Sequence, residues 1–236
     1  MLGQLAVGIA IGIVVLVYVI ATGMNPQSPA YAQQFARAVI LPMMISGIGI
    51  SVVMAYAVTR LWAWDLVRDR TDHGLGVRPV PRRHILISIL LGILLCIGCS
   101  ALSAWLVPFD PSKPLGPLAS AAVEGGVSRL VWAVLAVLIA PWLEEYFFRG
   151  LLLKGFSTTW GPAGGAIGVT VLFVLLHLFE TLHYWPATIA VTLLATVAVC
   201  LRLYYRSLAP AVALHAAYNA VIVLTAYSAA GNSPLR

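Results

Sequence analysis

The sequence has little charge. Only 9% of its 236 residues are Asp, Glu, Lys or Arg, and 61% are hydrophobic, whereas soluble domains carry roughly 25% charged residues. This shortage excludes an ordinary soluble protein. Apolar runs near the ~20 residues that a spanning helix needs recur along the whole chain and leave no stretch for a separate soluble domain. The composition predicts an all-α, polytopic membrane bundle with one domain over residues 1–236.

Cysteine is also scarce, with three in the chain. Cys96 and Cys99 form a CxxC pair, but they lie within the apolar run ILLCIGCSAL and no second pair completes a zinc site. We interpret them as small buried residues. The net charge of +6 includes the stretch RDRTDHGLGVRPVPRR, in which Asp residues are interleaved with Arg beside an apolar run. This pattern favours a topology signal near anionic lipid headgroups and argues against a nucleic-acid partner.

Hydropathy predicts about seven spanning helices, with six or eight as alternatives. The predicted spans are about 5–22, 36–62, 84–107, 128–152, 162–183, 186–204 and 208–229. The first has no basic region before it and is interpreted as a retained helix, not a signal peptide. Arginines crowd the connection between the second and third spans, so the positive-inside rule places that side and the N-terminus in the cytoplasm.

Few ionisable residues fall within the apolar segments, and such residues normally face a bundle interior. Glu144, Glu145 and Arg149 lie in WLEEYFFRG, at the end of the fourth span. Glu145 and Arg149 are one helical turn apart and can pair, whereas Glu144 points elsewhere, on the stripe of Phe148. The doublet predicts one paired carboxylate and one free carboxylate with a different role.

The next helix supplies a partner for the free carboxylate. The chain is predicted to turn near residues 160–161, with Glu144 about 16 residues before the turn and His177 about 16 after it. An antiparallel pair would place them at the same height, with Phe173 one turn from His177. Glycines at small-xxx-small spacing would let the helices approach closely, and these are Gly161, Gly164, Gly165 and Gly168.

The last predicted span adds His215 and Asn219, which are four residues apart on one helix face. A Glu, a His, and a His with an Asn at membrane depth suit a general base for water and donors for an oxyanion, as amide hydrolysis requires. A bland alternative stays open, because a single buried His or Asn often serves as a structural hydrogen bond between helices. Glu180 and His183 are interpreted as interfacial.

Together the three motifs resemble those of the CAAX protease and bacteriocin-processing family, also called Abi, of glutamic intramembrane proteases. The resemblance covers about residues 128–229 and rests on EExxxR, FxxxH and HxxxN. It implies a metal-independent endopeptidase in which Glu144, helped by His177, activates water and His215 and Asn219 bind the oxyanion. Glu145 and Arg149 would hold the helix and the first carboxylate in place, with Phe173 supporting. HExxH is absent, which disfavours zinc.

The resemblance leaves the substrate open among a CAAX-like tail, a bacteriocin leader and a C-terminal sorting signal, each membrane-anchored. Short length and modest loops favour a bacterial cytoplasmic membrane. Two other functions stay open: a non-proteolytic immunity or binding protein on the same scaffold, and a proton-coupled transporter. Transporters often carry inverted repeats with broken helices, and we find no such repeat in the sequence.

Overall fold

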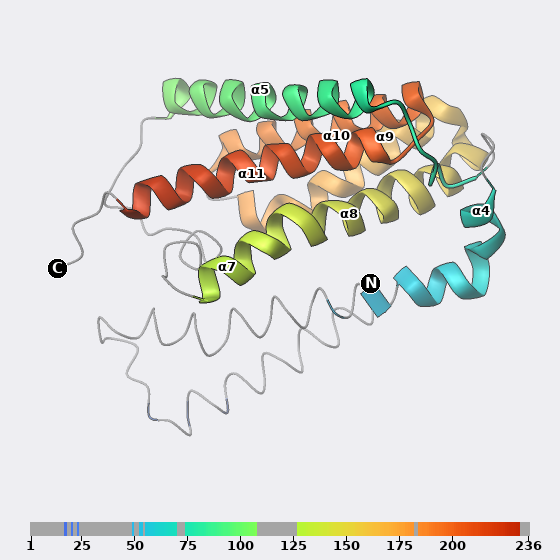
Figure 1. Cartoon of the computed structure of the whole chain (residues 1–236), viewed down its shortest axis with the longest axis horizontal. Helices are drawn as coiled ribbons and strands as arrows, with labels where there is room; N and C mark the ends of the chain where they lie inside the picture. The colour runs from blue at the N-terminus through green and yellow to red at the C-terminus, as the bar shows by residue number, and fades with distance from the viewer. Residues whose placement is uncertain are drawn as a thin grey trace.

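The structure is a computed structural model that describes residues 55–69, 74–107, 127–181 and 184–231, with a few isolated positions before residue 54. The predicted span 5–22 and most of 36–62 therefore lie outside the described residues. The described part of the chain is mostly helical and contains no strand (Figure 1). It confirms the all-α class, whereas the single domain stays a prediction.

Four helical stretches are long and apolar enough to cross a membrane, namely Arg82–Leu106, Arg129–Leu178, Trp185–Tyr205 and Ala209–Ser228. The second has 50 residues, far more than the ~20 that one crossing requires. It contains the predicted spans 128–152 and 162–183. They remain two separate helical legs, because the backbone at Gly161 is not helical.

The long stretch is built from short pieces in which regular and π-helical turns alternate. They are α7 (Val127–Val134), η3 (Leu135–Ile139), α8 (Ala140–Glu145), η4 (Tyr146–Leu152) and α9 (Leu153–Thr181), where η marks a π-helical turn. Such turns are rare and often mark functional sites. Both lie beside residues of the predicted motifs, because η3 precedes Glu144 and η4 contains Arg149.

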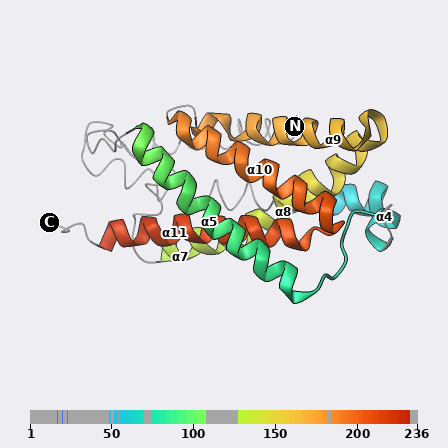
Figure 2. The ribbon, with the colours of Figure 1, turned by 90° about the horizontal axis from the view of Figure 1, so that it is seen from above.

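The chain reverses direction within α9. Gly161 has φ 72° and ψ 172°, a conformation that interrupts the helix and that suits a residue without Cβ. The predicted turn at residues 160–161 is therefore confirmed, and α8 and α9 lie in antiparallel legs (Figure 2). The glycines after the turn pack on the short segment before it: a Cβ on Gly168 would lie 2.9 Å from Phe156. They tighten the hairpin itself, not the contact with the Glu144 segment.

Three further helices complete the described bundle: α5 (Arg82–Leu106), α10 (Trp185–Tyr205) and α11 (Ala209–Gly231). Cys96 and Cys99 of α5 are buried against Ala198 of α10 and Leu214 and Tyr218 of α11, which confirms their interpretation as core residues. Gly92 lets α5 and α11 approach closely, because a Cβ there would collide with the Leu214 carbonyl. This packing fixes α11, the helix that carries His215.

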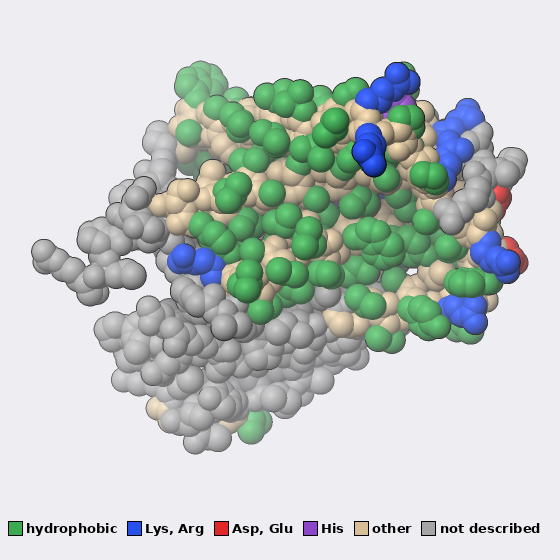
Figure 3. Space-filling view, viewed as in Figure 1, with side chains coloured by type: hydrophobic (Ala, Val, Ile, Leu, Met, Phe, Trp, Pro, Cys, Tyr) green, Lys and Arg blue, Asp and Glu red, His purple; other side chains and the backbone are tan. Residues whose placement is uncertain are grey.

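Basic side chains gather at one end of the bundle, around α4 (Trp64–Arg68) and the turn between α10 and α11 (Figure 3). An extended strap of residues 74–81 crosses this end. Leu208 N donates to the Gly76 carbonyl at 2.9 Å, and Ser207 Oγ donates to the Arg78 carbonyl at 2.7 Å. The strap is thereby fastened to the first residues before α11.

Candidate active site

Glu145 and Arg149 form a fully buried ion pair. Arg149 Nη1 donates to Glu145 Oε1 at 3.1 Å, and both side chains are 0% exposed. The predicted pairing of these residues is therefore confirmed. Arg149 Nη2 also donates to the Ala195 carbonyl of α10 at 3.0 Å, and its guanidinium lies 4.5 Å from the Phe173 ring centre. A buried pair needs such additional partners, because two charges have left water.

His215 joins this pair from α11. Its Nδ1 lies 2.9 Å from Glu145 Oε1, and the ring is almost fully buried. Because the carboxylate already accepts from Arg149, we assign it as ionised and the histidine nitrogen as the donor. This assignment leaves Nε2 of His215 facing the other carboxylate, with Oε2 of Glu144 at 3.8 Å.

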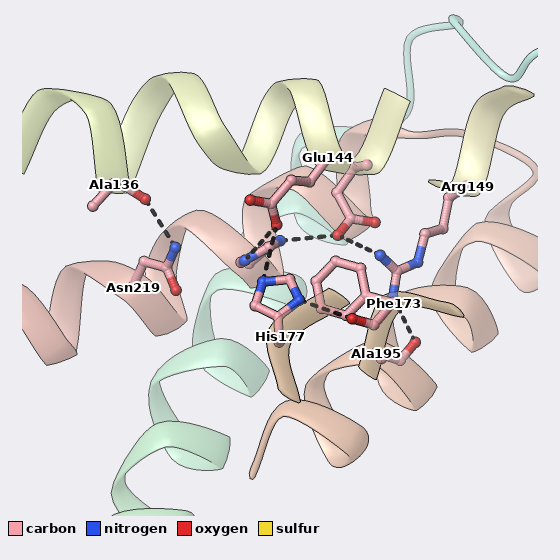
Figure 4. A network of polar contacts seen from close by, with 9 residues as sticks. Ala136, Glu144, Arg149, Phe173, His177, Ala195 and Asn219 are labelled. Carbon is pink, nitrogen blue, oxygen red and sulfur yellow. Dashed lines mark hydrogen bonds and ion pairs between the residues drawn. The ribbon is translucent and has the colours of Figure 1, made fainter. Parts of the chain in front are cut away.

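Glu144 differs from its neighbour in every contact. Its side chain is 31% exposed, and its Oε2 lies 3.9 Å from His177 Nε2 and 3.8 Å from His215 Nε2. These distances exceed direct hydrogen bonds, and Oε2 has no partner in the described residues. Figure 4 shows Glu144 and His177 pointing toward each other from opposite legs of the hairpin, as the equal spacing about the turn predicted.

Phe173 and His177 act as a unit on α9. Their rings stack with centres 4.3 Å apart, and His177 Nδ1 lies 2.8 Å from the Phe173 carbonyl. A carbonyl can only accept, so Nδ1 carries the proton and the lone pair of the neutral ring is at Nε2, toward Glu144. The predicted common face of these two residues is confirmed, and Phe173 sets both the orientation and the tautomer of His177.

Asn219 lies on α11 one turn beyond His215 and contacts η3. Its Nδ2 donates to the Ala136 carbonyl at 2.8 Å, as Figure 4 shows. The amide therefore fastens α11 to the helix leading to Glu144, a contact that spacing alone did not predict. One of its two N–H groups remains for another acceptor. The structural alternative left open for this residue is thus present, whatever catalytic role it also has.

Sequence reasoning missed Arg202. The predicted site residues do not include it. Arg202 lies in α10, is 9% exposed and donates through Nε to the Arg149 carbonyl at 3.2 Å. Its position within the apolar run of residues 186–204 was the available signal. The side chains of Glu180 and His183 lie outside the described residues.

An apolar groove of about 410 Å³ lies at the basic end of the bundle. Trp142 and Tyr146 of the helix leading to the site form one wall, and the strap and the start of α11 form the others. Trp142 stacks on Tyr146 with ring centres 5.4 Å apart. Glu144 projects from a different face of that helix, so the groove and the Glu144 cluster are separate features.

Metal binding is another chemistry that carboxylates and histidines can support. Among the residues that the structure describes, no group of three or more His, Cys, Asp or Glu side chains has an arrangement that holds a metal ion. What the cluster does offer is a buried carboxylate oxygen, Oε2 of the partly exposed Glu144, which faces two imidazole nitrogens beside a closed ion pair. Such a set can bind and deprotonate water.

Comparison with known proteins bears on this region of the chain. Residues 126–221 match the model of the Rce1-like family, described as type II CAAX prenyl endopeptidase Rce1-like. The matched segment contains EExxxR, FxxxH and HxxxN in full. No match was found among curated proteins or among solved structures.

Proposed function

We propose that this chain is a glutamic-type intramembrane endopeptidase, because residues 126–221 match the Rce1-like family model, described as type II CAAX prenyl endopeptidase Rce1-like. The family and the four membrane-spanning stretches make it an integral membrane protein. The proposed substrate is a membrane-anchored protein or peptide. The observation that carries the proposal is the position of Glu144 Oε2, within 3.9 Å of both His177 Nε2 and His215 Nε2.

The proposed reaction begins with one water molecule between Glu144 and His177. Its two O–H groups would donate to Glu144 Oε2 and to His177 Nε2, the two acceptors that face each other across the hairpin. Its lone pair is then free to attack the carbonyl carbon of the scissile peptide bond. As the C–O bond forms, Glu144 takes the proton and later delivers it to the leaving nitrogen when the C–N bond breaks.

The developing oxyanion needs donors, and α11 supplies two. His215 donates through Nδ1 to Glu145, so only the doubly protonated ring also has a donor at Nε2. The Glu145 carboxylate would stabilise that charged ring, so Glu145 would support catalysis through His215. Asn219 keeps one N–H for the oxyanion while the other holds Ala136. Removing one such donor typically costs about 10²–10³ in rate.

The first experiment compares new protein termini, by quantitative mass spectrometry, in membranes of the native host carrying wild type, Glu144→Gln or His177→Ala at matched expression. We expect a small set of termini to vanish in both variants. Their sequences would identify the substrate among tails, leaders and sorting signals, and would show whether the site opens to the cytoplasm or to the opposite side.

If no terminus changes although deletion of the gene has a phenotype, the proposal fails and a binding or immunity role takes its place. In that case Glu144→Gln leaves the phenotype intact. Transport is separated by the same variant, because proton coupling through Glu144 would be lost without any change in termini. The bacterial cytoplasmic membrane and the cytoplasmic N-terminus belong to this proposal and are tested by fusing reporter enzymes to each end of the chain.

A further inference from the structure

A second buried arginine lies behind the ion pair of the site. Arg202 of α10 is 9% exposed, and its Nε donates to the Arg149 carbonyl at 3.2 Å. Arg149 belongs to η4, where π-helical bonding interrupts the regular backbone ladder. Hydrogen bonds from charged donors are stronger than neutral ones in such dry surroundings. Arg202 therefore holds the backbone at the residue whose side chain pairs with Glu145.

The contact is reciprocal. Arg149 donates through Nη2 to the Ala195 carbonyl, and Arg202 donates back to the Arg149 carbonyl. Ala195 and Arg202 are seven residues apart, two turns along the same face of α10. Helix α10 is thus hydrogen-bonded to both the side chain and the main chain of Arg149. Two bonds at separate points fix the distance of η4 from α10, and also its rotation, in a way that one bond cannot.

The strap closes over this arginine. Gly76 has φ 81°, and a Cβ built on it would lie 2.6 Å from Arg202 Cζ and 2.8 Å from Nε. Only a glycine permits both this conformation and this close approach. The carbonyl of Gly76 accepts from Leu208 N at 2.9 Å, one residue before α11 begins. The strap consequently joins Arg202 to the helix that carries His215.

We propose that Arg202, held in place by Gly76, is a positioning residue for the Glu145–Arg149–His215 set, an inference that rests on the proposed function. Arg202 keeps η4 at the depth where Arg149 reaches Glu145, and Glu145 in turn orients His215 toward Glu144. It does not contact substrate in this scheme. Its loss should therefore reduce kcat and leave KM unchanged.

Kinetics on purified protein in proteoliposomes test the first half. The probe is an internally quenched peptide with a farnesyl-cysteine fourth from its C-terminus, the CAAX arrangement. We expect Arg202→Met to lower kcat about ten- to hundredfold at constant KM, the loss of one charge-assisted hydrogen bond. Arg202→Lys should recover part of it, because an ammonium also donates to a carbonyl but lacks the planar fork.

Gly76→Ala places a methyl group against the Arg202 guanidinium and should displace it. It should also lower kcat, by a smaller factor than Arg202→Met. Two matched controls separate general effects. Arg82→Met removes an exposed cation from the same end of the bundle, and Gly98→Ala adds a methyl where nothing lies within 4 Å. Both controls should retain wild-type kcat. A merely structural Arg202 would reduce the yield of folded protein while kcat per folded molecule stayed normal, and that result overturns the proposal.

Amide hydrogen exchange tests the second half without relying on turnover. Peptides covering residues 146–152 should exchange faster in Arg202→Met and in Gly76→Ala than in wild type, whereas peptides from the middle of α5 should not change. Unchanged protection of residues 146–152 overturns the inference, whatever the kinetics. If wild type fails to cleave any substrate, that outcome counts against the proposed function alone, and the exchange result still decides the role of Arg202.

Discussion

Two adjacent carboxylates in this molecule have opposite surroundings. Glu145 is 0% exposed and is bonded to Arg149 and His215, whereas Glu144 is 31% exposed and only faces imidazole nitrogens at 3.8 and 3.9 Å. Adjacent side chains in a helix point about 100° apart, so Glu144 and Glu145 lie in different surroundings on the same helical turn. Of the two carboxylates in this described region, only that of Glu144 has an oxygen without a bond that faces the imidazoles, on a side chain that is partly exposed.

Because of this difference, one helical bundle combines a rigid ion pair with a partly exposed carboxylate. The closed side, built from Glu145, Arg149 and the inner nitrogen of His215, fixes geometry through direct bonds. The open side makes no direct bond to the imidazoles, because Glu144 Oε2 lies 3.9 Å from His177 Nε2 and 3.8 Å from His215 Nε2. Because His215 contributes one nitrogen to each side, it transmits the order of the closed side to the open one.

The largest loss of turnover is expected at Glu144. In Glu144→Gln the amide cannot take a proton, so turnover should fall by about 10⁴-fold, the upper range for a general base. The side chain is partly exposed, and the substitution keeps its shape, so the thermal unfolding midpoint in detergent should stay at the wild-type value. Parallel rate and unfolding measurements check this. An active Glu144→Gln protein would remove Glu144 from the chemistry.

Substitutions on the closed side, at Glu145 and Arg149, should mainly lower the stability of the protein. Arg149→Met leaves the Glu145 charge buried without its main partner, which typically destabilises by about 3–5 kcal/mol. Denaturant titration of the reconstituted protein measures this loss. The double variant Glu145→Leu with Arg149→Met removes both charges and should recover much of the stability but none of the activity. Equal stability of Arg149→Met and wild type would show that the pair contributes nothing to folding.

How much of this site the sequence could predict depends on whether a contact is local. The Glu145–Arg149 pair and the Phe173–His177 unit follow from helical periodicity, and the meeting of Glu144 and His177 follows from their equal distance to the turn. The bonds of Arg202 to Arg149 and of Asn219 to Ala136 do not follow. Both end on backbone carbonyls in π-helical stretches, and periodicity of 3.6 residues does not indicate where a helix changes its bonding.

The fold shows the same limit. Composition and hydropathy predict a helical membrane bundle, and the spans over α5, α10 and α11 agree with the structure to within a few residues. The reversal between the predicted spans 128–152 and 162–183 also lies where it was predicted, at Trp160-Gly161. Hydropathy does not indicate that helical geometry continues from residue 152 as far as this turn, or that π-helical turns interrupt the helix before it.

A smaller effect is expected at Phe173, which touches both sides of the comparison. Its ring stacks on His177 and lies 4.5 Å from the Arg149 guanidinium carbon. Phe173→Leu keeps an apolar side chain but loses both ring contacts, each worth about 0.5–2 kcal/mol. We expect about a tenfold lower kcat and slightly lower stability. Phe173→Tyr, which keeps the ring, serves as the control, and a Leu variant as active as wild type would contradict the orienting role.

The smallest effect is expected from removing metal ions. The Glu145 carboxylate is hydrogen-bonded to Nδ1 of His215. In other proteins such a carboxylate also orients histidines that bind a metal. This contact alone therefore does not distinguish water activation by Glu144 from water activation by zinc. The metal-free mechanism requires no ion, because Glu144 serves as the base and His215 and Asn219 serve as the oxyanion donors. Dialysis of the purified protein against 1,10-phenanthroline should therefore leave kcat and the unfolding midpoint unchanged, with a metal content by mass spectrometry far below one ion per chain. If activity is lost and returns when zinc is added, the glutamic mechanism is wrong. Glu144, His177 and His215 would then be ligands in a metal-dependent mechanism.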